Sequence, residues 1–62
     1  MKEDLRVTKT KKFLYETLIS LMEEKSFEEI KVSDICKKAL INRSTFYSHY
    51  SDKYELFMEL IN

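Results

Sequence analysis

The stretch that decides the fold reads NRSTFYSHY and spans residues 42–50. It is typical of a short helix with a good cap, because Asn42 can accept a hydrogen bond from amides that a helix start leaves unpaired. Phe46 and Tyr50 lie four residues apart on one face, which predicts that they pack together. The other face carries Arg43, Ser44, Tyr47 and Ser48, with His49 on its flank. This face has one cation, several hydroxyl groups and no acid, and it suits the major groove of DNA.

The segment before this helix extends the pattern. Apolar residues recur there at helical spacing, at Val32, Ile35, Cys36 and Ala39. They predict a helix over residues 32–39, which three residues join to the next helix. Two short helices with such a turn, the second polar on its outer face, form a helix-turn-helix. We expect this motif over about residues 31–50.

Two further helices are expected on either side of this motif. The first spans about residues 8–25, with an apolar stripe formed by Leu14, Leu18, Leu21 and Met22 and widened by Tyr15 and Ile19. The last begins at Asp52, which forms a D-x-x-E capping box with Glu55. Its apolar face holds Leu56, Phe57, Leu60 and Ile61. The predicted fold is all-α: a three-helix, homeodomain-like helix-turn-helix head plus the start of a fourth helix.

Length and composition limit the class of protein. The chain has 62 residues, enough for one small domain, and it contains no Gly and no Pro. The single cysteine, Cys36, excludes an internal disulfide and fits a reducing compartment. No apolar run approaches the roughly 18 residues of a membrane span. Residues 1–12 lack the apolar segment of a secretory signal. We expect a cytoplasmic protein.

The formal net charge is zero, but the charges are segregated along the chain. Residues 1–12 carry five cations and two acids, and residues 31–50 carry four cations and one acid. Residues 13–30 carry one cation and five acids, and residues 51–62 one cation and three acids. The two basic blocks can share one face, and such a face binds phosphate even on a neutral protein.

Catalytic and metal sites find little support in the residue types. The paired glutamates of residues 23–24 and 28–29 are adjacent in sequence, so they do not face each other on a helix. Cys36 lies in an apolar face and is expected to be a buried, inert thiol. The alternative is a reactive pair of Cys36 with His49, although nothing nearby would lower the thiol pKa. One Cys and one His fall short of a zinc site. We expect no enzyme, no metal and no cofactor.

Residues 39–56, ALINRSTFYSHYSDKYEL, resemble the signature of the tetracycline-repressor (TetR/AcrR) family. That signature has a small residue, Gly, an aliphatic residue and a polar cap, then T-[LF]-Y-x-[HY]-[FY] and a later Lys-x-[DE]-Leu. Upstream, Phe27 and the segment of residues 32–35 match F-x(4)-[VI]-x-[DE]-I. The sequence departs from the family at Ser26 and Leu40 in place of Gly, Lys31 in place of a Ser or Thr cap, and Tyr54 in place of an acid. With Lys31 there, Ser33 is expected to cap the second helix one turn late.

The resemblance implies a DNA-binding head over residues 8–62, preceded by a flexible basic arm at residues 1–7. In the family two such heads bind a palindromic operator as a dimer, and a C-terminal domain, absent here, senses a ligand. The full-length protein is thus expected to be a homodimer and this chain alone a monomer. The implied base-facing residues are Arg43, Ser44, Thr45 and Ser48. The implied phosphate contacts are Tyr47, His49 and Lys53.

Physical chemistry adds detail to these roles. A helix N-terminus attracts phosphate, which adds Asn42 to the phosphate set and supports Lys53. Arg43 can make a bidentate contact to guanine, worth about 1–3 kcal/mol of discrimination. Tyr47 and His49 have the alternative of being ordinary surface or core side chains. The main alternative for the whole chain is a helical protein-interaction module that does not bind DNA.

Overall fold

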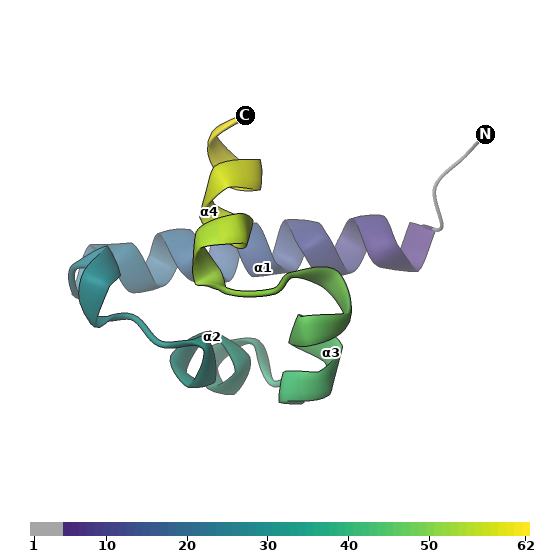
Figure 1. Ribbon diagram of the computed structural model, residues 1–62, viewed down its shortest axis with the longest axis horizontal. Helices are drawn as coiled ribbons and strands as arrows, with labels where there is room; N and C mark the ends of the chain where they lie inside the picture. The colour runs from purple at the N-terminus through teal and green to yellow at the C-terminus, as the bar shows by residue number, and fades with distance from the viewer. Residues whose placement is uncertain (1–4) are drawn as a thin grey trace.

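The computed structural model describes the backbone of residues 5–62 and the side chains from Thr8 onward. The elements are α1 (Leu5–Glu24), the 3-10 helix η1 (Phe27–Glu29), α2 (Val32–Ala39), α3 (Arg43–His49) and α4 (Lys53–Ile61). The long helix α1 runs the length of the molecule, α2 and α3 lie along one side of it, and α4 crosses it (Figure 1). This arrangement confirms the predicted all-α head with a fourth helix. Within residues 5–62, no helix is both long and apolar enough to cross a membrane.

A core of buried apolar side chains joins all four α-helices. Its members are Leu14, Leu18, Leu21, Ile30, Ile35, Cys36, Ala39, Phe46, Tyr50 and Leu56. Burial of each large aliphatic side chain contributes about 1.5–3 kcal/mol to folding before entropy is counted. The predicted apolar faces of α2, α3 and α4 supply most of this core. The Phe46 and Tyr50 rings pack with their centroids 5.8 Å apart, as their spacing predicts.

The buried face of α1 differs from the predicted stripe at two positions. Thr17 is buried, whereas Ile19, predicted at one edge of the stripe, is exposed. The reason is helix geometry: Thr17 lies three residues after Leu14 and four before Leu21, so it falls in the centre of the buried face. Ile19 follows the buried Leu18, and the helix turns its side chain about 100° away from that of Leu18 and out of the core.

The ends of α1 and α2 also correct the predictions. Helix α1 begins at Leu5, so residues 5–7 of the predicted arm are helical; the rest of that arm, residues 1–4, lies outside the described residues. Helix α2 begins directly after Lys31, and Ser33 does not cap it. Instead the Lys31 amide donates to Asp34 Oδ2 at 2.9 Å. A carboxylate three residues into the helix thus serves the helix start that the missing Ser or Thr would have capped.

Helix α4 begins at its predicted cap. Asp52 Oδ1 accepts from the Glu55 amide at 2.9 Å. Glu55 Oε1 in turn accepts from the Ser51 amide at 2.6 Å, one residue earlier than the capping box predicts. Both carboxylates therefore satisfy backbone amides at the turn between α3 and α4.

Candidate nucleic-acid interface

The turn between α2 and α3 sets the angle of the second helix. The Ile41 amide donates to Cys36 O at 3.0 Å, and the Leu40 amide donates to Lys37 O at 3.3 Å. These two bonds form a Schellman motif, which requires a left-handed residue at its centre. Leu40 adopts that conformation, with φ 59° and ψ 44°. Leucine thus takes a geometry that the glycine of the family signature would adopt without a steric cost.

Helix α3 is held by its apolar side and exposes the other. Phe46 is fully buried and Tyr50, the residue that ends the helix, is almost so. Arg43, Ser44 and Ser48 are exposed, as predicted, whereas Thr45 is half-buried. The Ser48 hydroxyl donates to Thr45 O at 2.6 Å, so its hydrogen is already used inside the helix. Ser48 therefore presents mainly an acceptor to any partner.

Asn42 stands at the N-cap of α3, but its side chain does not cap the helix. The amides of Thr45 and Phe46 both donate to the backbone carbonyl of Asn42, at 3.1 and 3.2 Å. Because the backbone oxygen already serves these donors, the predicted side-chain cap is wrong. The side chain of Asn42 is exposed beside Arg43.

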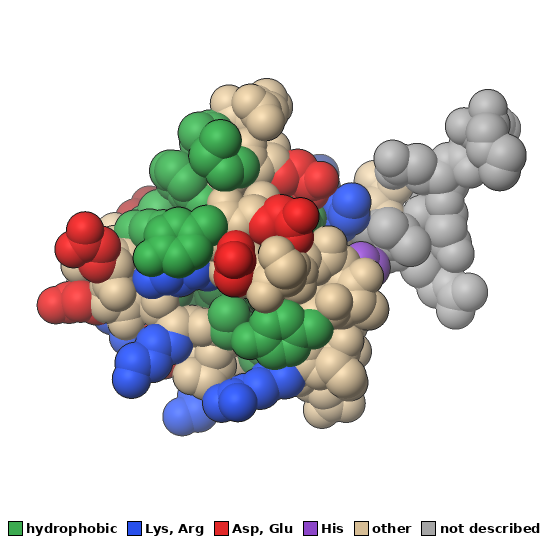
Figure 2. All heavy atoms as spheres, in the orientation of Figure 1, with side chains coloured by type: hydrophobic (Ala, Val, Ile, Leu, Met, Phe, Trp, Pro, Cys, Tyr) green, Lys and Arg blue, Asp and Glu red, His purple; other side chains and the backbone are tan. Residues whose placement is uncertain are grey.

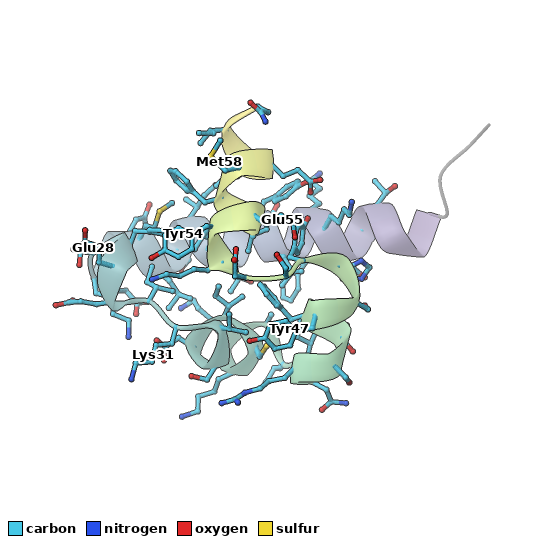
Figure 3. All side chains as sticks on the ribbon, viewed as in Figure 1. Glu28, Lys31, Tyr47, Tyr54, Glu55 and Met58 are labelled. Atoms are coloured by element: carbon cyan, nitrogen blue, oxygen red, sulfur yellow. The ribbon has the colours of Figure 1, made fainter. Side chains whose placement is uncertain are left out.

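Tyr47 and His49, the two predicted phosphate contacts on α3, lie in different surroundings. Tyr47 is 51% exposed, and its ring meets the edge of Phe46 with centroids 5.4 Å apart. In Figure 3 its side chain comes off α3 on the side that faces α2. His49 is half-buried, with its ring centroid 6.3 Å from that of Tyr50. Packing fixes the orientation of both rings and leaves part of each at the surface.

A basic border lies along the same face. Lys31, Lys37, Lys38 and Arg43 are all exposed, and Lys38 is paired with Glu24 of α1 at 3.0 Å. No ion pair between described residues engages Lys37 or Arg43. In Figure 2 the lower edge of the molecule, below α2 and α3, carries Lys and Arg side chains and no acidic ones. From residue 35 to residue 51 the sequence contains no Asp or Glu, so this edge has a positive field.

Lys53 has partners that oppose its predicted role. Its ammonium donates to Ile30 O at 2.6 Å, Phe27 O at 2.7 Å and Glu28 O at 3.3 Å. It also lies 4.6 Å from the ring centroid of Phe27 and 5.4 Å from that of Tyr54. All three donors of the ammonium therefore serve the carbonyls around η1. Lys53 ties the start of α4 to η1, and we do not retain it as a phosphate anchor.

Cys36 is buried, and burial raises the pKa of its thiol. The Sγ atom lies 4.0 Å from Asn42 O, a distance that allows only a weak hydrogen bond. A raised pKa keeps the thiol protonated and unreactive, which argues against the alternative of a reactive pair with His49. Among residues 8–62, no three potential metal ligands of the types His, Cys, Asp and Glu come together.

A polar cluster that sequence reasoning missed joins α1, the end of α3 and α4. Glu59 Oε1 accepts from the hydroxyls of Tyr15, at 2.5 Å, and Tyr50. Lys11 lies 3.5 Å from Glu59 Oε2 and 5.7 Å from the centroid of the Tyr50 ring. Its members lie on separate elements: the sequence places Tyr15 and Tyr50 on apolar faces, whereas Lys11 and Glu59 alone resemble ordinary surface residues. No signal in the sequence connects them.

Hydrogen bonding within this cluster shifts the pKa values of its members. The bonds from Tyr15 and Tyr50 lower the pKa of Glu59, with a smaller contribution from Lys11. Burial, followed by the bond to Glu59, raises the pKa of Tyr50. The Glu59 carboxylate thus stays charged and the Tyr50 hydroxyl stays protonated, which is the pairing that holds the end of α3 against α4.

Comparison with known proteins agrees with this geometry. The sequence model of the bacterial regulatory proteins of the tetR family matches residues 14–60. A relative in Bacillus subtilis (strain 168), the uncharacterized HTH-type transcriptional regulator YxbF, is 39% identical over 59 residues, which cover 94% of this chain and 16% of that protein. The HTH-type dhaKLM operon transcriptional activator DhaS of Lactococcus lactis subsp. lactis (strain IL1403) is 36% identical over 61 residues, covering 86% of this chain and 33% of that protein. The chain therefore spans a third or less of either relative, and no solved structure matches it significantly.

Proposed function

Because the chain belongs to the tetR family of bacterial regulatory proteins, we propose that it is the sequence-reading head of a transcriptional regulator and that α3 enters the major groove of its operator. The observation that carries this proposal is the exposed side of α3, which combines several hydroxyls and a cation without an ion-pair partner in the described part of the chain with a basic border from α2. The opposite side of α3 packs into the hydrophobic core. The exposed side is therefore available to a polyanionic partner.

The base-facing set in this proposal is Arg43, Ser44, Thr45 and Ser48. Arg43 is exposed at the first position of α3 and has no ion-pair partner among the described residues, so its guanidinium can reach guanine O6 and N7. Ser48 would accept rather than donate, since its hydroxyl hydrogen serves Thr45 O. Thr45 is half-buried, so we assign it the smallest share of the contact.

The phosphate set in this proposal is Asn42, Tyr47 and His49. The Asn42 side chain is exposed at the start of α3, where its Nδ2 hydrogens can donate to a phosphate oxygen. The half-exposed Tyr47 hydroxyl and the His49 ring lie at the edges of the same helix. Contacts of this kind fix the register of a protein on the duplex and carry little sequence information.

In the full-length protein, two heads of a homodimer would bind the two halves of a palindromic operator in the bacterial cytoplasm, where the chromosome is accessible. DhaS is named an activator of an operon, and a DNA-reading head serves activation and repression alike. The proposal therefore concerns DNA reading, with no catalytic step and no cofactor at the head.

Titration of the chain with duplex DNA at several salt concentrations tests the proposal. The expected result is binding at low salt that weakens linearly on a log–log plot, because each neutralised phosphate releases counterions. Arg43→Ala should weaken a preferred duplex more than a random one and close the gap between them. A matched control is Lys9→Ala, which removes a cation from the basic block of residues 1–12 and should keep the gap between the two duplexes. Absence of binding at low salt would instead support the protein-interaction alternative.

A further inference from the structure

Leu40 is the residue that neither the fold nor the proposed contacts explain. Among residues 5–62 it alone has a positive φ, and a leucine pays a steric penalty there because its Cβ approaches the following carbonyl. Its side chain is 90% exposed, the largest exposed fraction among the big apolar residues of the described chain. The side chain therefore gains no burial that would offset the strained backbone. Both properties disfavour leucine as a purely structural choice.

The backbone at this position still has a defined task. The left-handed conformation closes the Schellman motif through the Leu40 and Ile41 amides, which fixes the path from α2 into α3. Ile41 turns inward and packs against the core. Because neighbouring side chains at such a turn diverge, Leu40 is the one directed to solvent. A glycine would keep the same hydrogen bonds without the penalty.

The surroundings of Leu40 belong to the proposed interface. Leu40 stands two residues before Asn42 and three before Arg43, at the end of α3 that leads into the groove. Exposed Lys37 and Lys38 precede it in α2, and the segment from residue 35 to residue 51 has no acid. An apolar side chain amid cations does not bind phosphate. In the major groove the apolar group that it can meet is the C5-methyl of thymine.

We propose that Leu40 is a specificity-determining residue that contacts a thymine methyl group at the edge of the site read by α3. This inference rests on the proposed function and adds a base preference to it. Leu40 would lose water-exposed apolar surface only in the complex, which is when the strained position gains its favourable contact. Arg43 and Leu40 would then read neighbouring base pairs, one by hydrogen bonds and the other by an apolar contact.

The test begins with duplexes that the wild-type chain enriches from a random pool. Leu40→Gly should keep or raise the melting temperature, since glycine relieves the left-handed strain, yet weaken the enriched duplex about tenfold. Replacing the contacted thymine by deoxyuridine removes only its methyl group and should weaken wild-type binding about fivefold. The same replacement should leave binding by Leu40→Gly unchanged. Opposite changes in stability and affinity separate a contact from a folding defect.

Two controls sharpen the result. Leu40→Asn introduces a residue that adopts the left-handed conformation more readily and has no large apolar side chain. It should lose affinity as Leu40→Gly does. Met58→Ala removes another exposed apolar side chain, on α4 and outside the proposed interface, and should bind the enriched duplex as the wild type does. Equal affinity of Leu40→Gly and wild type for the enriched duplex would overturn the Leu40 contact alone. If the wild type enriches no duplex, the proposed function itself fails.

Discussion

Asn42 and Asp52 occupy the same position before their helices but bond differently. Asp52 accepts a hydrogen bond from the Glu55 amide, whereas the Asn42 side chain accepts none from α3. The difference lies in the third residue of each helix: the Thr45 amide donates to the Asn42 backbone carbonyl, whereas the Glu55 amide donates to the Asp52 side chain. A capping residue in the sequence thus predicts where a helix begins, but not which oxygen satisfies its first amides.

We therefore expect Asn42→Ala to leave stability nearly unchanged while it weakens DNA binding. The stabilising bond at this helix start is made by backbone atoms that the substitution keeps. Asp52→Ala is the matched control, and loss of its cap should cost about 1 kcal/mol of unfolding free energy. Thermal melts of both variants and titration with an enriched duplex measure these effects. A fall in melting temperature for Asn42→Ala equal to that of Asp52→Ala would show that Asn42 caps α3 in solution.

Lys53 illustrates how a residue of the family signature can serve the fold. We expect Lys53→Met to lower the unfolding free energy by about 1–2 kcal/mol, because a half-buried ammonium that serves three carbonyls is lost. Methionine retains the apolar contact with Phe27. The salt dependence of DNA binding, measured at a temperature where both proteins are folded, should keep its slope. A slope flatter by about one unit would restore Lys53 to the phosphate set.

The elements α1, α3 and α4 meet at Glu59, and this junction makes stability depend on pH. The pKa of Glu59 is lowered in the fold by its bonds to Tyr15 and Tyr50. The pKa of Asp34 is likewise lowered, first by the Lys31 amide and then by Lys25. A carboxylate with a lowered pKa binds its proton less readily in the folded state than in the unfolded state. Its contribution is present above the unfolded pKa and is lost as pH falls through the folded pKa.

Stability should accordingly hold at neutral pH and decline as the pH falls below the ordinary glutamate value of 4.5. Glu59→Gln should lower the melting temperature at pH 7 and make the acid decline shallower, because the variant has no carboxylate to protonate at this junction. Glu55→Gln is a control on the same helix, outside the Tyr15 and Tyr50 cluster. Thermal melts of the three proteins between pH 3 and pH 7 measure this dependence. Identical pH profiles for wild type and Glu59→Gln would exclude Glu59 as a source of the dependence.

At the scale of the molecule, the largest group of exposed apolar side chains among residues 8–62 lies on α4. Tyr54, Met58 and Ile61 follow one another at helical spacing and are 57%, 54% and 58% exposed. Figure 3 shows Tyr54 and Met58 on the outer side of α4. Three side chains on a nine-residue helix are far from the roughly 1,200–2,000 Å² that a stable protein interface buries.

We therefore expect the 62-residue chain to be monomeric at micromolar concentration. It should also bind one half of a palindromic duplex much more weakly than a covalently linked pair of heads, since linkage raises the effective concentration of the second head. Sedimentation with and without a palindromic duplex measures both properties. Met58→Lys is a control that should leave the sedimentation of the free chain unchanged. A tight dimer of the wild type that Met58→Lys dissociates would contradict this expectation and place an interface on α4.

Local sequence patterns were enough to predict much of this structure. The apolar spacing of Leu14, Leu18 and Leu21, the pair Phe46 and Tyr50, and the cap at Asp52 predicted the helices and the buried side of each. Helical periodicity and capping involve residues about one turn apart, so both can be recognised in the sequence. The motif of residues 39–56 indicated the family for the same reason, since its residues act within one turn-and-helix unit.

The roles of individual polar side chains depended on packing instead. Lys53 reaches carbonyls 23–26 residues earlier in the chain, and Glu59 binds hydroxyls nine and 44 residues away. These partners meet only after α1, η1 and α4 have packed, because no periodicity links residues that far apart. Leu40 differs, because its left-handed backbone closes hydrogen bonds within five residues; packing decides there only that Ile41 turns inward and that the Leu40 side chain stays exposed. The sequence alone determined the helices, their order and the family, whereas tertiary contacts decided which charged and strained residues hold the head together and which are free to meet DNA.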